Sequence, residues 1–234
     1  MTRSLIALAL AAGAAAADIP LTDDTGRYTL DTLWIEGGMG PGIASGDVAN
    51  VSTGQTSFDQ SLDGSWQPGM HAGVEWQRAK LHLDGEGWGL GLAVWYDRAP
   101  GRITAASTPS GPVDVDVDLE VESLSLAVMP TWIWRFDGDA LDRVTTSAWQ
   151  WEVAPILAIG AARAQVDGGD TSSVGLAWQA GARVRLHARI VGGLRAGIHA
   201  GATWFEARPR WDNTGQATFS GFSPLLGAAL GYEF

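Results

Sequence analysis

The sequence predicts an all-β protein, a transmembrane antiparallel up-and-down β-barrel of eight strands formed by residues 18–234. Three observations predict this class: apolar and polar residues alternate along most of the chain, the chain opens with a secretory leader, and it ends on an aromatic residue. Alternation with a period of two indicates strands that bury one face, and no stretch sustains a helical period. An even number of strands returns the last strand to the side where the first began, as bacterial barrels require.

The first 17 residues have the charge, apolar and small-residue order of a secretory signal peptide. Arg3 precedes an unbroken apolar stretch, and Ala15 to Ala17 form an A-x-A cleavage site, so the mature chain is expected to begin at Asp18. The apolar stretch is far shorter than the roughly 20 residues of a membrane-spanning helix. The chain contains no Cys, which argues against a lipid-anchored protein.

The composition is unusual for a soluble domain, with 46% hydrophobic residues, only 18% charged residues, 31 Gly and 12 Trp. Membrane barrels place aromatic rings in two girdles at the water interfaces, where an apolar ring and a polar N–H are both accommodated. Removal of Arg3 with the leader changes the formal net charge from -11 to -12. Such acidity disfavours nucleic acid as a partner, because nucleic acids bind through neutralisation of their phosphates.

Eight segments alternate in this way, and clusters of Gly, Asp, Pro and Asn separate them. Residues 39–65 are rich in Gly, Ser, Asp and Asn, contain no Lys or Arg, and are expected to form the longest extracellular loop. Short periplasmic turns are expected at residues 84–86 and 188–190, and a longer connection at 137–146. The predicted strands span approximately residues 28–38, 66–82, 87–108, 113–136, 147–164, 173–187, 191–207 and 217–234.

The third and fourth segments predict a hairpin whose outward faces mark the membrane borders. A turn at 109–111 brings Trp88 opposite Trp132 and Tyr96 opposite Leu124. The distance along the barrel axis from Trp88 to Tyr96 is then about 20 Å, which approximates the height of the apolar band of such barrels. The expected aromatic girdles comprise Trp88, Tyr96, Trp132, Trp134, Trp149, Trp151, Trp178 and Trp204.

Beyond the outer border, the same hairpin alternates acidic residues with Val and Leu. If the alternation of inward and outward side chains continues without a bulge, the acids point outward, on the same face as Arg98 and Arg102. The apolar residues of 113–121 then point inward, and the hairpin is expected to project beyond the membrane. The alternative is a bulge near Ser123 that turns the valines outward. Carboxylates at this height could share divalent cations with lipopolysaccharide phosphates, whereas a solvated strand face is the simpler interpretation. The acids are Asp114, Asp116, Asp118, Glu120 and Glu122.

Residues of the opposite parity face the lumen, and most of the charged ones lie in its periplasmic half. An eight-stranded barrel is only wide enough for its own side chains, so opposed Glu and Arg are expected to neutralise each other as a plug. The alternative is a selectivity constriction or gate, which requires a continuous water path. Because Arg outnumber Glu, any residual field there favours anions. The expected lumen charge network comprises Glu75, Arg135, Glu152, Arg183, Arg185, Arg195 and His199.

Higher in the barrel the inward positions are small, mostly Gly and Ala. Together with Val113, Val115 and Val117 near the outer mouth, they could line a cavity for a lipid or another hydrophobic ligand. Glycines in barrels also relieve strand curvature, which is the alternative interpretation.

An outer-membrane enzyme would need a His with Ser and an acid, or a His with Asp, near the outer face. The chain has four His residues, and none is followed two positions later by Ser, the spacing that resembles the lipid A deacylase pattern. Only His71 is expected near the outer rim, with no Ser partner apparent from spacing. The sequence therefore predicts no catalytic residue, no metal site and no cofactor.

The final strand alternates from Leu226 to Phe234, with one apolar face and one small or polar face. Tyr232 and Phe234 resemble the terminal signal by which outer-membrane barrels are recognised by their assembly machinery. The mature chain as a whole resembles, in architecture, the small outer-membrane barrels of the OmpA transmembrane domain, OmpW and opacity-protein group. This resemblance implies a place in the Gram-negative outer membrane, in contact with membrane lipid, lipopolysaccharide and the barrel assembly machinery.

Functions in that group range from membrane anchoring and surface adhesion to uptake of small hydrophobic molecules. The first expectation is a nonenzymatic surface barrel that displays residues 39–65 and the acidic hairpin to a partner or to lipopolysaccharide. The second is a narrow pore or uptake barrel for a small hydrophobic molecule. A lipid A-modifying enzyme of the outer membrane is the third.

Overall fold

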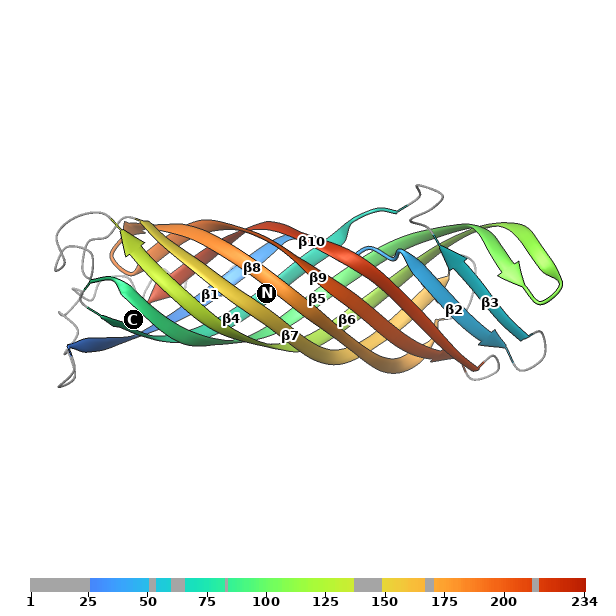
Figure 1. Cartoon of the computed structure of the whole chain (residues 1–234), viewed down its shortest axis with the longest axis horizontal. Helices are drawn as coiled ribbons and strands as arrows, with labels where there is room; N and C mark the ends of the chain where they lie inside the picture. The colour runs from blue at the N-terminus through green and yellow to red at the C-terminus, as the bar shows by residue number, and fades with distance from the viewer. Residues whose placement is uncertain are drawn as a thin grey trace, which may run out of the picture.

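The computed structural model describes residues 26–50, 54–59, 66–82, 84–136, 149–166, 171–211 and 215–234. The predicted leader and the connection at 137–146 lie outside these residues. Within the described ranges, ten strands form one closed antiparallel sheet with strongly tilted strands (Figure 1). The strands are β1 (Arg27–Gly40), β2 (Ser45–Asn50), β3 (Gly54–Asp59), β4 (Gly69–His82), β5 (Glu86–Thr108), β6 (Gly111–Phe136), β7 (Trp149–Val166), β8 (Ser173–Val191), β9 (Leu194–Trp211) and β10 (Gly215–Glu233).

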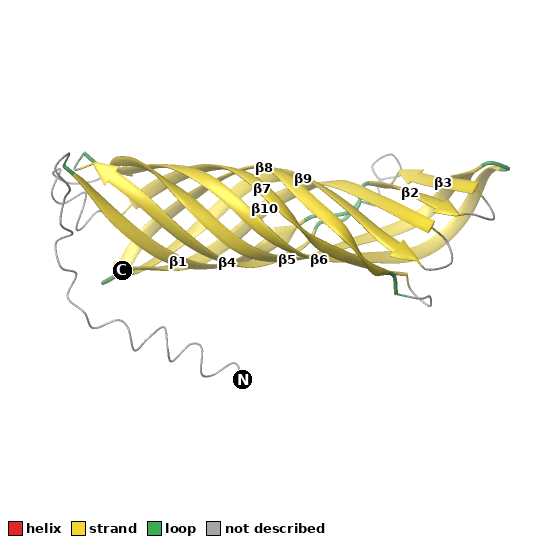
Figure 2. Cartoon of the chain, turned by 90° about the horizontal axis from the view of Figure 1, so that it is seen from below, coloured by secondary structure: helices red, strands yellow, loops and turns green. Residues whose placement is uncertain are grey.

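The barrel wall contains eight strands at each level, which agrees with the predicted fold. At the end where β1 begins and β10 ends, here called the lower end, β1 lies between β10 and β4. Nearer the opposite, upper end, β1 and β4 stop, and the hairpin of β2 and β3 lies between β10 and β5 (Figure 2). β5 to β10 form the rest of the ring. In the part of the chain that the structure describes, no helix is long and apolar enough to cross a membrane.

The prediction of one extracellular loop at residues 39–65 is therefore wrong in part. β2 pairs with β10 over four residue pairs that include Val48 with Ala217, and β3 meets β5 where Ser57 lies opposite Ser107. These pairings make the segment part of the barrel wall, because hydrogen bonds to the neighbouring strands fix its backbone.

Backbone hydrogen bonds also close the wall just below this hairpin. The N–H of Ile43 donates to the carbonyl oxygen of Pro100 in β5 at 3.2 Å, and the N–H of Ala44 donates to that of Ser220 in β10 at 2.9 Å. The Ile43 side chain is fully buried inside the barrel. The short connection between β1 and β2 thus bridges the two flanking strands.

The hairpin of β5 and β6 has the register that the sequence predicts. Trp88 lies opposite Trp132, and Tyr96 lies opposite Leu124. The chain reverses just before Gly111, whose φ of 118° falls in the region that glycine tolerates. The tip of this hairpin extends past β2 and β3 at the upper end of the barrel (Figure 1).

A register shift interrupts this hairpin between Ile103 and Ala105, close to its tip. Pairing continues without interruption through Ser123, where the alternative interpretation places a bulge. The residues from 117 to 122 consequently keep the predicted parity, with acids on the outside of the barrel.

The turn between β8 and β9 differs from the prediction. β8 continues through residues 188–190, where the sequence predicts a periplasmic turn. The chain reverses instead at Gly192, whose φ is 54°, and Gly193. The other predicted strand boundaries lie within a few residues of those observed.

Side chains fill the lumen in layers, and the outer wall carries an apolar band. An apolar layer near the lower end contains Tyr28, Leu81 and Ile133, and polar side chains dominate the middle. The upper apolar cluster is built from Ile43, Ala99, Leu119, Val121, Ala162, Ala164, Ala177, Phe205, Ala207, Ala217 and Phe219. The large apolar side chains exposed on the outer wall include Leu33, Ile35, Leu90, Leu92, Leu126, Leu157, Ile198 and Leu230.

Candidate functional site

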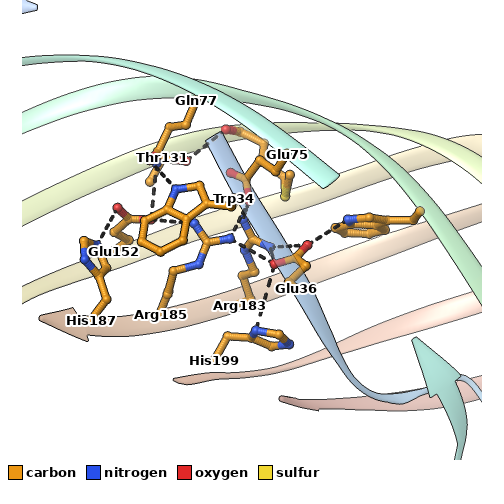
Figure 3. Close-up of polar contacts among 12 residues, drawn as sticks. Trp34, Glu36, Glu75, Gln77, Thr131, Glu152, Arg183, Arg185, His187 and His199 are labelled. Carbon is orange, nitrogen blue, oxygen red and sulfur yellow. Dashed lines mark hydrogen bonds and ion pairs between the residues drawn. The ribbon is translucent and has the colours of Figure 1, made fainter. Parts of the chain in front are cut away.

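A buried network of ion pairs occupies the middle of the lumen (Figure 3). Arg183 and Arg185 of β8 share the carboxylates of Glu36 in β1 and Glu75 in β4. Nη1 of Arg183 lies 2.7 Å from Oε2 of Glu36, and Nη2 of Arg185 lies 3.0 Å from the same oxygen. Nη2 of each arginine also donates to Glu75. None of the four residues is more than 4% exposed, so these charges are separated from bulk water.

Glu152 of β7 extends this network toward the lower end. Its carboxylate accepts hydrogen bonds from Arg185 at 3.2 Å, Gln77 at 3.2 Å and Gln150 at 2.8 Å. Nε2 of His187 lies 2.9 Å from the same carboxylate. Four neighbours therefore use the oxygens of Glu152. The central network is defined as Glu36, Glu75, Asp97, Glu152, Arg183 and Arg185 with their hydrogen-bond partners.

Trp34 covers one face of the network. Its ring centroid lies 4.3 Å from the guanidinium carbon of Arg185, and its Nε1–H donates to Oε1 of Gln77 at 3.2 Å. A cation above an aromatic face is stabilised by the ring quadrupole, more so when water is excluded. The ring thus stabilises the arginine that contacts all three glutamates of the network.

His71 and Asp97 lie at the upper side of the network. Nδ1 of His71 is 2.7 Å from Oδ1 of Asp97, whose second oxygen accepts a hydrogen bond from Gln179 at 2.5 Å. Nε2 of His71 lies 3.7 Å from Glu36, which also accepts a hydrogen bond from Trp95 at 2.9 Å. The expectation that His71 lies near the outer rim is wrong, because its side chain is buried inside the barrel.

The His71–Asp97 pair invites comparison with a catalytic triad, which needs a nucleophile bonded to the free nitrogen of the His. That nitrogen faces a carboxylate here. Ser123 lies opposite Asp97 in β6, but its hydroxyl makes no hydrogen bond among the described residues. Nor does any group of three His, Asp or Glu in the described ranges have an arrangement that could hold a metal ion.

The predicted lumen residues fall into two groups. Glu75, Glu152, Arg183, Arg185 and His199 surround the central network, with Nδ1 of His199 lying 3.9 Å from Glu36. Arg135 and Arg195 lie lower, next to the carboxylate of Glu233. The lower arginine cluster is defined as Arg135, Arg189, Arg195 and Glu233.

The sequence-based prediction missed several lumen residues, including Glu36, Asp97 and Glu233. The alternation of inward and outward side chains along each strand is the signal that indicates these positions. Leu33 and Ile35 are apolar and exposed, so the alternate residue Glu36 has to face inward. The same parity argument places Glu233 inside, because Tyr232 belongs to the apolar face of the last strand.

Glycines make room for the large side chains of the network. A Cβ atom on Gly91 would lie 2.5 Å from Oε1 of Glu75, and one on Gly227 would lie 2.7 Å from Nε2 of His199. Such distances are shorter than van der Waals contact, so a larger residue at these positions would force the Glu75 or His199 side chain to move. At these two positions the space beside the glycine is occupied by a neighbouring side chain, which favours a packing role over the interpretation as a cavity lining.

An apolar cluster lies in the lumen beneath the outer mouth. Leu119 and Val121 point inward, but they contact the upper apolar cluster and not a cavity. Val113 is 46% exposed, contrary to the prediction that it lines the inside, because it lies at the tip of the hairpin, where residues 112–114 are all exposed. Val117 is partly buried, and the side chain of Val115 lies outside the described residues.

Charged side chains continue on the outer face of β5 and β6 above the aromatic border. Arg102 makes two hydrogen bonds with Asp116, at 2.9 and 3.1 Å, and lies 3.9 Å from Asp118. The hydrogen bond from Arg102, together with its positive charge, lowers the pKa of Asp116. Both acids are more than two-thirds exposed. The outer charged hairpin is defined as residues 98–122 of β5 and β6.

Closer to the border, the remaining acids also have arginine partners. Arg98 lies 2.5 Å from Glu120, and Arg163 of β7 lies 2.5 Å from Glu122. The hydroxyl of Tyr96 donates to Glu122 at 2.7 Å. A polar depression of about 520 Å³ lies against this face and includes Gln67, Gln165 and both Arg98 and Arg102 in its lining.

The predicted girdle residues lie on the outside of the barrel in two rows. Trp88 and Trp132 are adjacent at the lower border, and Trp134 lies opposite Trp151 there. Trp204 belongs to the upper row, where it lies opposite Phe222. All predicted girdle residues except Trp178 are at least 39% exposed, and Trp178 is partly buried. The rings of Tyr232 and Phe234 stack at 6.5 Å at the lower end, and their role in assembly stays a prediction.

The solved structures that are similar to this chain include the following three. Neisserial surface protein A, NspA, is 11% identical, with a TM-score of 0.34, and covers 89% of this chain and 99% of its own. Ail, the attachment invasion locus protein of Yersinia pestis, in complex with the heparin analogue sucrose octasulfate is 14% identical, with a TM-score of 0.32 and coverages of 88% and 99%. A further Ail structure is 14% identical, with a TM-score of 0.27 and coverages of 89% and 99%.

No family model matches the sequence, and no curated protein matches it. The fold assignment therefore depends on the chain's own geometry: a closed antiparallel barrel, an apolar outer band between two aromatic rows, and a polar interior. These are the features of small transmembrane β-barrels.

Proposed function

We propose that this chain is a nonenzymatic outer-membrane β-barrel that displays its upper end outside the cell. The apolar band and the two aromatic rows support a membrane location, because lipid-facing residues of such barrels are apolar and aromatic rings lie at both interfaces. The lower end, where both terminal strands meet, is then periplasmic.

The observation that carries the proposal is the length of the hairpin formed by β5 and β6. These strands continue past Tyr96 and Leu124, and their outward faces change there from apolar to charged. A charged outward face is costly within hydrocarbon but is stable among polar headgroups. The outer charged hairpin thus suits a position in the headgroup layer and beyond.

Lipopolysaccharide is the partner that we propose for this surface. Arginines such as Arg98, Arg102 and Arg163 can donate charge-assisted hydrogen bonds to its phosphates. Carboxylates beside them can share divalent cations with the same phosphates. A surface with both kinds of group would bind lipopolysaccharide in two ways, one direct and one dependent on the cation.

The test measures binding of labelled lipopolysaccharide to the refolded mature protein in neutral detergent, with Mg²⁺ and with a chelator. Asp116→Asn combined with Asp118→Asn should abolish the increase in binding that Mg²⁺ causes. Arg98→Gln combined with Arg102→Gln should weaken the binding that persists in the chelator.

A matched control is Arg208→Gln, which removes an exposed arginine from β9, away from this hairpin. It should leave both components of binding unchanged. Binding that is equal in the wild type and in both double variants would contradict the proposal, provided that each protein shows the folded electrophoretic mobility.

A further inference from the structure

Three arginines and one glutamate meet at the lower end of the lumen. Glu233 accepts hydrogen bonds from Arg135 at 2.7 Å, Arg189 at 3.0 Å and Arg195 at 2.8 Å. The arginines come from the ends of β6, β8 and β9, and Glu233 is the last residue of β10. The fold thus brings three guanidinium groups around one carboxylate.

The other lumen carboxylates are committed to the central network. Glu36 and Glu75 contact Arg183 and Arg185. Glu152, the nearest of them to the lower end, already accepts hydrogen bonds from four side chains. Side-chain charge in the lumen is consequently uneven, with four carboxylates and two arginines in the central network but one carboxylate and three arginines in the lower cluster.

Arg195 has two guanidinium nitrogens that remain available for a ligand. It is 1% exposed, and only its Nε donates to Glu233. Its Nη1 and Nη2 atoms are buried and have no hydrogen-bond partner within the described residues. A buried charged donor without a partner is costly. The two free nitrogens form one edge of a planar fork, whose spacing matches two oxygens of a carboxylate or phosphate group.

The cluster lies next to the lower mouth of the barrel. The side chain of Arg189 is 17% exposed and that of Glu233 is 8% exposed, whereas Arg135 and Arg195 are each 1% exposed. The exposed members are at the rim and the buried members behind them. A ligand from the periplasmic side would therefore meet Arg189 before it reaches Arg195.

We propose that the lower arginine cluster binds a phosphate-type oxyanion at the periplasmic mouth of the barrel. The free edge of Arg195 would take two oxygens of the anion, and Arg135 and Arg189 would contribute positive charge. Two sources share this chemistry: free phosphate groups of periplasmic solutes and phospholipid headgroups of the inner leaflet. This inference is independent of what the outer charged hairpin binds.

The test is calorimetric titration of inorganic phosphate into the refolded mature protein in a maltoside detergent, which contains no phosphorus. The wild type should bind phosphate saturably. Arg195→Met should weaken this binding by about tenfold or more, which corresponds to about 1.4 kcal/mol. Arg208→Met makes the same change at an exposed site of the opposite end and should bind like the wild type.

A second variant separates an anion site from a purely structural cluster. Glu233→Gln removes the competing negative charge and should tighten phosphate binding, whereas a cluster that only neutralises Glu233 would lose order and gain no affinity. Phosphate binding that is absent from the wild type, unchanged in Arg195→Met, or no tighter in Glu233→Gln would overturn the proposal.

The source of the anion is distinguished by repeating the titration in vesicles. If headgroups occupy the site, phosphatidylglycerol vesicles should suppress the binding of added phosphate relative to vesicles of an uncharged glycolipid. If free phosphate groups are the ligand, the two kinds of vesicle should give equal affinity. Circular dichroism and heat-dependent electrophoretic mobility show that each variant is folded.

Discussion

At the scale of single residues, Arg183 is one of the two arginines that neutralise the carboxylates of the central network. It contacts Glu36 and Glu75, and both carboxylates are fully buried. A buried ion pair contributes little net stability compared with an apolar pair, but removal of one partner leaves an uncompensated charge. The network is therefore more sensitive to truncation than its net contribution to stability suggests.

Arg183→Ala should lower the free energy of unfolding by about 3–5 kcal/mol, because it leaves the buried carboxylates of Glu36 and Glu75 with Arg185 as their one remaining arginine partner among the described residues. Urea unfolding of the protein in lipid vesicles, followed by tryptophan fluorescence, measures this loss. The matched control is Arg163→Ala, which removes the exposed partner of Glu122. It should cost less than about 1 kcal/mol, as exposed pairs do. Equal losses in the two variants would show that Arg183 is not a buried ion partner.

A second residue-scale prediction concerns pH. Asp116 has a pKa below its ordinary value of 3.8 because Arg102 bonds and attracts its carboxylate. A lowered pKa in the folded state means that the ion pair is present at neutral pH and is lost only as the pH falls through that lowered value. Carbon NMR of labelled Asp side chains should show Asp116 titrating below pH 3.8, and Arg102→Gln should raise its pKa. An unchanged titration in the variant would contradict the pairing.

At the scale of elements, the hairpin of β2 and β3 replaces two strands of the barrel wall. β1 and β4 cover the lower part of the gap between β10 and β5, and the hairpin covers the upper part. Phe219 and Ile43 of the upper apolar cluster lie behind this segment and are buried. We infer that the hairpin keeps water away from that cluster.

Replacement of residues 45–59 with a short Gly-Ser linker should leave the lower ring closed, because β1 still pairs with both β10 and β4. The upper apolar cluster should become exposed, so that an apolar fluorescent dye binds more strongly and the free energy of unfolding falls. Deletion of residues 107–112 at the tip of the outer charged hairpin is the control and should not change dye binding. Unchanged dye binding in the 45–59 replacement would contradict the inference.

At the scale of the whole molecule, the barrel is divided along its axis by chemistry. Apolar side chains fill the upper lumen, the central network fills the middle, and the lower arginine cluster lies at the lower mouth. An eight-stranded barrel has an interior that its own side chains can fill. We therefore expect two consecutive layers, the upper apolar cluster and the polar central network, to close the lumen to ions.

Much of this arrangement could be predicted from the sequence because strand parity depends on local pattern alone. The opposition of Trp88 and Trp132 and the inward direction of Arg183 follow from a period of two once the lipid face is known. The partners of each lumen charge could not be predicted. Arg183 and Glu36 are 147 residues apart in sequence, and their contact depends on the closure of the barrel.

The sequence did not predict the β2–β3 hairpin, for a different reason. Residues 39–65 contain many Gly and Ser residues and show no alternation. In the orientation that we propose, this part of the wall lies above the lipid and needs no apolar outer face. Its strand structure comes from pairing with β10 and β5, which are distant in sequence. The register shift near Ala105 likewise leaves no signal in the alternation.

Single-channel conductance of the refolded mature protein in a planar bilayer tests the central claim, that the barrel is a closed scaffold, most directly. We expect no stable openings for the wild type, because side chains of the central network and of the upper apolar cluster occupy the lumen. The double variant Arg183→Ala, Arg185→Ala serves as the comparison. Stable wild-type openings whose size or ion preference changes in the double variant would contradict the account, since the lumen would then be a pathway with these arginines as its filter.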